Sequence, residues 1–277
     1  MPVTKCQLMF NIDGMTISQH LEAARKIVFK FGSNTLAGDD GRINSTFLAE
    51  FAEQTAFLMD KGKQVVIVSS GAQVAGLSTL DKWVRKKDLH YRQALCAVGQ
   101  VQLMEAWRLA FRPFGCHIAQ ILLTREDFGD SIRTLNMRNT LFTLVDEGII
   151  PVINENDTVS VEEIKIGDND TLAARSAILW NADLLVLFSD IDGLHDKNPK
   201  EFPDAKLVEE VRDIDAARDG VSMGAVSSFG TGGIETKLEA ARLANSYGIP
   251  TILANGGRPR CLEALAGGTQ KGTVFAV

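Results

Sequence analysis

Short apolar segments rich in β-branched residues alternate along the chain with longer segments of helical periodicity. The short segments lack polar alternation, which is typical of strands buried on both faces of a mostly parallel sheet. They cover residues 27–31, 65–68, 118–123, 149–153, 184–188, 250–253 and 273–277. The pattern therefore predicts seven strands of one sheet.

Amphipathic helices are predicted between these strands. Between the first two, Phe47, Phe51 and Leu58 recur at helical spacing. Similar patterns cover residues 91–111, 133–147, 171–180 and 235–247. Because alternating strands and helices form right-handed crossovers, the predicted fold class is α/β, a three-layer αβα sandwich with a mostly parallel central sheet.

The chain is expected to form one catalytic domain, residues 26–277, preceded by an N-terminal arm, residues 1–25. No low-complexity linker or internal repeat divides it. In the arm, Thr16 and Gln19 are expected to form a capping box before a short helix over residues 21–26. The charged stretch 193–219 is expected to be an excursion between a strand and a helix.

Composition narrows the class of protein. The 277 residues are 45% hydrophobic and carry a formal charge of −6, which argues against nucleic-acid or membrane-surface partners. No apolar run is long enough to span a bilayer, and the N-terminus lacks a signal-peptide pattern, so we expect a cytoplasmic protein. Four cysteines and four histidines are scattered without metal-ligand spacing. We therefore expect chemistry that does not use histidine.

Glycine and small polar residues follow the first two predicted strands. The first is followed by Gly32 directly after Lys30 and Phe31, and the second runs into the segment SSGA at residues 69–72. Glycine lets backbone N–H groups approach phosphate, and lysine adds positive charge. Each feature alone also fits an ordinary turn. The chain has no GxxxxGK[ST] motif, and no GxGxxG follows the first strand, so neither a P-loop nor a dinucleotide fold is predicted.

Two polar clusters follow the fourth apolar segment, NEND at residues 154–157 and GDND at residues 167–170. Asp168 or Asn169 can cap the helix predicted from Thr171. A cap needs only one such residue, whereas seven Asn, Asp or Glu side chains are gathered here. Several of them are therefore expected to bind a polar substrate or to hold cations.

A glycine-rich segment, GTGGIETK at residues 230–237, precedes the last long predicted helix. Lys237 falls in the first helical turn, where a positive charge opposes the helix dipole. That cost is offset if an anion is bound there, and the alternative is a flexible loop followed by a solvated lysine. The segment is therefore predicted to wrap a phosphate group.

Taken together, KFGSN, SSGA, INENDTV, GDNDTLAA, SDIDGL and GTGGIETK, in this order, resemble the glutamate 5-kinases of the amino acid kinase superfamily. The resemblance runs from about residue 26 to residue 277. KFGSN recurs across the superfamily, whereas INENDTV with GDND and GTGGIETK is more specific to this family. Many members carry a C-terminal PUA domain, and we expect this chain to lack it.

The resemblance implies an ATP- and Mg²⁺-dependent transfer of phosphate to the side-chain carboxylate of L-glutamate, the first step of proline biosynthesis. It implies that Lys30 and Lys237 contact the phosphates and that Asp170 orients both lysines. It implies glutamate binding by Ser70, Gly71, Asn154, Asp157 and Asn169. It implies ATP binding by Lys30, Gly32, Ser189, Asp190, Thr231, Gly232, Gly233, Ile234, Glu235, Thr236 and Lys237. The magnesium ligands stay unassigned.

The resemblance also implies partners. Members of the family are commonly oligomeric and often inhibited by proline, so we expect a homo-oligomer with proline feedback inhibition. The product is a labile acyl phosphate, so handover to glutamyl phosphate reductase is a further hypothesis. No nucleic-acid or membrane partner is expected.

The chemistry agrees with the residues. A glutamate side chain has a pKa of about 4.3 and is already an anionic nucleophile at neutral pH, so no general base is needed. Two alternatives stay open: a superfamily kinase for aspartate, acetylglutamate, carbamate or UMP, and a non-catalytic sensor of ATP, glutamate or proline. INENDTV with GDND favours glutamate, and the presence of both lysines and Asp170 favours catalysis.

Overall fold

The computed structural model describes residues 14–38, 40–80, 88–160, 169–197, 199, 201–222 and 233–277. Within these residues, eight strands form a single sheet of order β3-β4-β2-β1-β5-β7-β8-β6. The strands are β1 Lys26–Phe31, β2 Gln64–Ser69, β3 Ile118–Leu123, β4 Ile150–Glu155, β5 Leu184–Ser189, β6 Glu210–Val211, β7 Thr251–Asn255 and β8 Gly272–Phe275. All neighbours from β3 to β7 pair in parallel, which confirms the predicted mostly parallel sheet.

The far edge of the sheet differs from the sequence-based expectation. Strand β8 runs antiparallel to β7, and β6, which was not predicted, pairs in parallel with β8. Strand β6 lies inside the stretch 193–219 that was expected to be an excursion. It has two residues and buries only Val211, so it is too short to show a periodic pattern.

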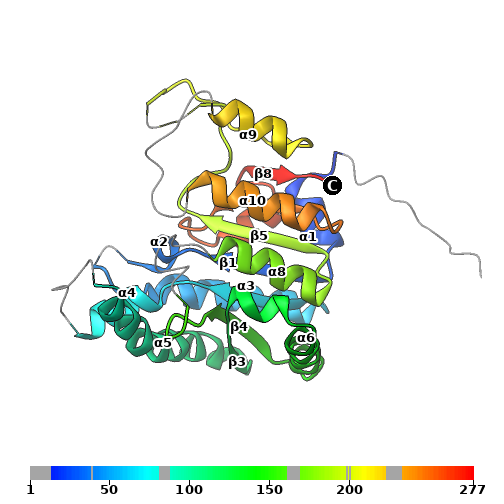
Figure 1. Ribbon diagram of the computed structural model, residues 1–277. Coiled ribbons are helices and arrows are strands. Elements are labelled where there is room, and N and C mark those ends of the chain that lie inside the picture. The colour runs from blue at the N-terminus through cyan, green and yellow to red at the C-terminus, as the bar shows by residue number, and fades with distance from the viewer. Residues whose placement is uncertain are drawn as a thin grey trace, which may run out of the picture.

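Helices cover both faces of the sheet and complete the three layers (Figure 1). The predicted helices over residues 91–111, 133–147, 171–180 and 235–247 agree with the structure to within two residues at each end. The described helices are α1 Ile17–Ala23, α2 Ser33–Leu36, α3 Ser45–Asp60, α4 Ala72–Leu80, α5 Leu89–Phe111, α6 Ser131–Asp146, α8 Asp170–Trp180, α9 Ile214–Ser222, α10 Ile234–Asn245 and α11 Cys261–Ala266. Short 3₁₀ turns lie at Arg112–Phe114 and Arg125–Gly129.

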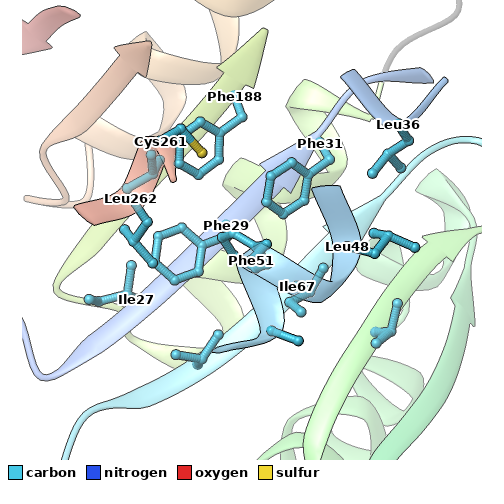
Figure 2. Close-up of a cluster of buried hydrophobic side chains, with 14 of the residues drawn as sticks. Ile27, Phe29, Phe31, Leu36, Leu48, Phe51, Ile67, Phe188, Cys261 and Leu262 are labelled. Carbon is cyan, nitrogen blue, oxygen red and sulfur yellow. The ribbon is translucent and has the colours of Figure 1, made fainter. Parts of the chain in front are cut away.

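Strand β1 separates the two halves of the core. Because successive strand side chains point to opposite faces, Phe29 and Phe31 lie on one side and Val28 and Lys30 on the other. Phe29 and Phe31 join the apolar cluster under α3, α5 and α11, where the rings of Phe31 and Phe188 stack 5.1 Å apart (Figure 2). Val28 belongs to the second cluster, under α6, α8 and α10. The alternation thus directs the Lys30 side chain toward α8 and α10.

Helices α4 and α5 touch through their backbones. A Cβ atom at Gly99 would lie 1.8 Å from the carbonyl oxygen of Ala72, and one at Gly76 would lie 2.0 Å from that of Leu95. Any side chain at these two positions would therefore force the helices apart. The close approach fixes α5 relative to the turn that follows β2, where Gly71 has a φ of +106°.

The N-terminal segment is tied to the sheet. The predicted capping box is present, and it starts α1 at Ile17, four residues earlier than predicted, because the helix begins directly after Thr16. Leu21 is buried in the main core. Lys63 Nζ donates to the carbonyls of Leu21, Glu22 and Ala24 at 2.8, 2.9 and 2.7 Å. The described part of the arm thus packs against the sheet, and the boundary at residue 25 stays a proposal.

A membrane-spanning helix is not found in the part of the chain that the structure describes. The cytoplasmic location stays a prediction from the sequence.

Replacing Lys63 with methionine is expected to lower the free energy of unfolding by about 1–3 kcal/mol, because three carbonyls at the end of α1 lose a charged donor. The measurement is urea denaturation of the wild type and the variant. The matched control is Lys61→Met, because the Lys61 side chain is exposed and lies over the Phe57 ring. Equal unfolding midpoints for Lys63→Met and Lys61→Met would contradict this role.

Candidate active site

The predicted site residues gather at the carboxyl ends of the central strands. Strand β1 lies between β2, the next strand in the chain, and β5, which the chain forms much later. Such a change of direction in strand order leaves a crevice beyond the strand ends, where ligands bind in open α/β sheets. Lys30, Ser70, Asn154 and Ser189 lie at the ends of β1, β2, β4 and β5, respectively, or directly after them.

Two lysines share one buried carboxylate. Asp170 is the first residue of α8 and is fully buried. Lys30 of β1 forms an ion pair with Asp170 Oδ1, and Lys237 of α10 places Nζ 3.1 Å from Asp170 Oδ2. The lysine side chains are only 4% and 6% exposed. These three groups carry a net charge of +1 in a place with little water to screen it, so they are suited to an anionic ligand.

The start of α10 adds to this anion-binding end. Thr236 Oγ1 lies 3.1 Å from Asp170 Oδ2 and 2.8 Å from the Gly233 carbonyl oxygen. Gly233 is the N-cap and has no side chain to bond the first N–H groups of the helix. Lys237 follows in the first turn, as predicted. The first N–H groups of a helix, together with a lysine in its first turn, fit phosphate oxygens.

Four further residues of the GTGGIETK segment were predicted to bind ATP: Thr231, Gly232, Ile234 and Glu235. Thr231 and Gly232 lie outside the described residues. Ile234 packs beside the second core cluster, and the Glu235 carboxylate pairs with Arg218 of α9. The Ile234 side chain is therefore used in packing, and the Glu235 side chain lies in a half-exposed ion pair.

Two segments meet beyond the carboxyl ends of β1 and β5. The Ser189 hydroxyl donates to Asp190 Oδ1 at 3.1 Å, and Asn34 Nδ2 donates to Asp190 Oδ2 at 3.4 Å. Gly32 is the N-cap of α2, directly before Ser33. The structure thus places the KFGSN and SDIDGL segments side by side.

A second buried cluster consists of polar, uncharged side chains. Asn169 Nδ2 donates to Ser70 Oγ at 2.9 Å and to Asn154 Oδ1 at 2.8 Å. Asn154 Nδ2 donates in turn to Gln100 Oε1 at 2.8 Å. Asn169 stands at the N-cap of α8, yet its amide is directed to Ser70 and Asn154 and makes no cap bond. Because Asn169 and Asp170 are adjacent, the start of α8 joins this cluster to the two lysines.

Asp157 lies beside α5. Burial raises the pKa of its carboxyl to about 6, while a hydrogen bond from Cys96 and the positive charge of Arg92 act in the opposite direction. Gln93 Nε2 donates to the Asp157 main-chain carbonyl at 3.1 Å. A carboxyl held in this way changes its charge just below neutral pH.

Sequence reasoning missed three residues of α5 that contact the predicted glutamate-binding segment: Gln93, Cys96 and Gln100. The available signal was weak, because Gln100 is a polar residue at a buried position of an amphipathic pattern. In the described part of the chain, no group of three His, Cys, Asp or Glu side chains is arranged to hold a metal ion.

Comparison with known proteins agrees with this arrangement. The model of the amino acid kinase family matches residues 25–255. The chain is 62% identical to the glutamate 5-kinase of Alkaliphilus metalliredigens (strain QYMF) over 259 residues, 94% of this chain and 98% of the relative. It is 45% identical to that of Treponema pallidum (strain Nichols), covering 91% of this chain and 96% of the relative. For that of Geobacter metallireducens (strain ATCC 53774 / DSM 7210 / GS-15), identity is 46%, covering 92% of this chain and 68% of the relative.

Solved structures with lower identity share the fold. The UMP kinase from Ureaplasma parvum superposes with a TM-score of 0.62 at 16% identity, covering 91% of this chain and 99% of that one. An isopentenyl phosphate kinase superposes with a TM-score of 0.61 at 17% identity, covering 91% of this chain and 100% of that one. From the family model and the relatives of high identity, the chain belongs to the amino acid kinase family and, within it, to the glutamate 5-kinases.

Proposed function

We propose that this protein phosphorylates the side-chain carboxylate of L-glutamate with ATP, giving L-glutamyl 5-phosphate and ADP as the first step of proline biosynthesis. The observation that carries the proposal is the buried group of Lys30, Asp170 and Lys237, which adjoins a polar, uncharged cluster. A phosphoryl-binding end and an acceptor-binding end meet there at the start of α8. Residues 26–277 form the catalytic domain in this proposal.

The two lysines act on the transferred phosphoryl group. Their ammonium groups reduce the repulsion between the acceptor carboxylate and the phosphates, and they stabilise the charge of the in-line transition state. Asp170 holds both lysines in place through its two oxygens. Gly32, Ser189, Asp190, Gly233 and the first turn of α10, together with Thr231 and Gly232, bind the rest of ATP.

Magnesium fits this site as a companion of ATP. Mg²⁺ is usually held by substrate phosphates, waters and one or two carboxylates. The described residues contain no group of three His, Cys, Asp or Glu side chains that could hold a metal ion, and the protein ligands of Mg²⁺ stay unassigned. When bound, Mg²⁺ would neutralise phosphate charge. The positioning of the phosphoryl group is the role of Lys30, Lys237 and Asp170.

The acceptor is held by Ser70, Gly71, Asn154, Asp157 and Asn169. Amide and hydroxyl groups suit the carboxylates of glutamate, and the Asp157 carboxylate suits its ammonium group. The acceptor carboxylate has a reference pKa of about 4.3, so it attacks as an anion without a general base.

Further proposals concern partners. Family membership supports a homo-oligomer and feedback inhibition by proline. The lability of an acyl phosphate supports handover to glutamyl phosphate reductase. A cytoplasmic location accords with these proposals.

The reaction is tested by ADP release with ATP and Mg²⁺, comparing glutamate with aspartate, N-acetylglutamate and UMP. Hydroxylamine is included to trap an acyl phosphate as a hydroxamate. ADP and hydroxamate that both depend on glutamate are the expected result. Turnover only with another acceptor would contradict the assignment of glutamate as the substrate. Binding of ATP and glutamate without turnover would instead favour a sensor.

Lys30→Ala and Lys237→Ala are each expected to lower turnover by about a hundred- to a thousandfold, because each removes a preorganised positive charge from the transition state. Both variants should stay folded, since Asp170 keeps one lysine partner in each. The control is Lys271→Ala, whose side chain is 69% exposed in a surface pair with Glu209. Near-normal turnover of a folded variant would exclude that lysine from the transfer step.

The affinity for glutamate is expected to weaken as the pH falls through about 6, because Asp157 then takes up a proton and loses its attraction for the substrate ammonium. Below that pKa the KM should rise about tenfold per pH unit. Asp157→Asn should have a high KM at pH 7.5 that changes little down to pH 5. Steady-state kinetics at fixed ATP measures both profiles, and parallel profiles would show that another group titrates.

A further inference from the structure

One face of α5 holds the segment that we assign to glutamate binding. Gln93, Cys96 and Gln100 are spaced by three and four residues, so they lie on one side of the helix. Gln93 contacts the Asp157 carbonyl, Cys96 contacts the Asp157 carboxylate, and Gln100 contacts the amide of Asn154. None of these three α5 side chains was assigned a role from the sequence.

The packing of α5 against α4 fixes the position of Gln100. It follows Gly99, whose backbone lies so close to the start of α4 that an added Cβ would lie 1.8 Å from the Ala72 carbonyl oxygen. Helix α4 in turn begins directly after Ser70 and Gly71. The approach of the two backbones therefore fixes Gln100 relative to Ser70, at the opposite end of the hydrogen-bonded cluster.

The direction of the hydrogen bonds in the cluster is set by the backbone. The main-chain N–H of Glu155 donates to Asn154 Oδ1 at 2.9 Å, and a main-chain N–H can only donate. Asn154 must therefore turn its Nδ2 toward Gln100, which must present Oε1 as the acceptor at 2.8 Å. Asn169 then has to present Nδ2 to Asn154 Oδ1, as it does at 2.8 Å.

The same direction reaches Ser70. Asn169 Nδ2 also donates to Ser70 Oγ at 2.9 Å, so this hydroxyl is an acceptor within the cluster. A hydroxyl group has one hydrogen of its own to donate. In the described residues no acceptor takes that hydrogen, so it is available to an anionic ligand.

We propose that Gln100 is a positioning residue for the acceptor. Its Oε1 completes a hydrogen-bond relay through Asn154 and Asn169 whose direction leaves the Ser70 hydroxyl as a donor to a carboxylate of the acceptor. This inference rests on the proposed function, because it assumes that Ser70, Asn154 and Asn169 bind the acceptor. Gln100 acts on the substrate through the other side chains and does not touch it.

One further feature makes the role of Gln100 testable. Its side chain is 8% exposed, and its Nε2 has no hydrogen-bond partner in the described part of the chain. The relay thus uses only the carbonyl oxygen of the side chain. The substitution Gln100→Glu keeps a side-chain oxygen at this place, and burial favours the neutral form of the new carboxyl group. Methionine has a similar shape but no comparable acceptor.

The test compares KM for glutamate and for ATP in the wild type, Gln100→Met and Gln100→Glu, with the Kd for glutamate from isothermal titration as a second readout. Gln100→Met should raise the KM and Kd for glutamate about ten- to hundredfold, because Asn154 Nδ2 loses its buried acceptor. The KM for ATP should change by less than about twofold. Gln100→Glu should restore most of the affinity for glutamate.

The matched control is Gln54→Met. Gln54 is buried in α3, where it donates to the Glu50 carbonyl at 2.7 Å and accepts from the Glu263 N–H at 2.8 Å. This variant should lose stability without a selective change in the KM for glutamate.

Several results would overturn the relay. These are an equal rise of both KM values in Gln100→Met, unchanged affinity for glutamate in that variant, or a Gln100→Glu variant as weak as Gln100→Met. If Gln100→Met does not fold, Gln100→Glu decides alone, and a large rise in its KM for glutamate rejects the relay. If the wild type phosphorylates a different acceptor, the proposed substrate fails, and the same comparison of variants is made with that acceptor.

Discussion

The buried carboxylate of Asp170 holds the site together, because it is the counter-ion of two lysines that are almost out of water. An unpaired buried charge is costly, so each lysine requires Asp170, and Asp170 requires at least one of the lysines. The lysines come from β1 and α10, and the carboxylate comes from the first residue of α8. The ion pairs therefore form only when the sheet and both helices on this face are packed. Burying these charges costs free energy of folding. It also strengthens the attraction between the lysines and phosphate, because little water screens them.

A second constraint comes from the close approach of the backbones of α4 and α5. Gly76 and Gly99 let α4 and α5 approach until no side chain fits between them. The position of α5 then determines where Gln100 and Cys96 meet the NEND segment. The ion pairs of Asp170 thus define one end of the site, and the hydrogen-bonded cluster of Ser70, Asn154, Asn169 and Gln100 defines the other. The adjacent residues Asn169 and Asp170 belong to one end each.

The sheet with its helices determines the fold, whereas the hydrogen-bonded cluster at the acceptor end is expected to determine which acceptor binds. Kinases named for UMP and for isopentenyl phosphate superpose on this chain at 16–17% identity, so the sheet and its helices do not decide the acceptor. Direction within a hydrogen-bond network discriminates more finely, because a buried donor or acceptor left without a partner is costly. The cluster of Ser70, Asn154 and Asn169 is therefore where we expect acceptor choice to be made.

Local signals in the sequence determined most of the elements and the principal charged residues. An unbroken apolar run predicted β1, helical periodicity predicted α5, and the spacing of Thr16 and Gln19 predicted the capping box of α1 but not the residue at which the helix starts. A lysine in an unfavourable first turn pointed to an anion at Lys237. The tertiary structure alone decided the direction of β8, the pairing of β6 and the contacts of Gln100, Gln93 and Cys96. The reason is physical: periodicity records which side of an element is buried. Hydrogen bonds such as Asn154 to Gln100 or Asn169 to Ser70 join residues 54 and 99 positions apart, so their geometry exists only once the layers have packed.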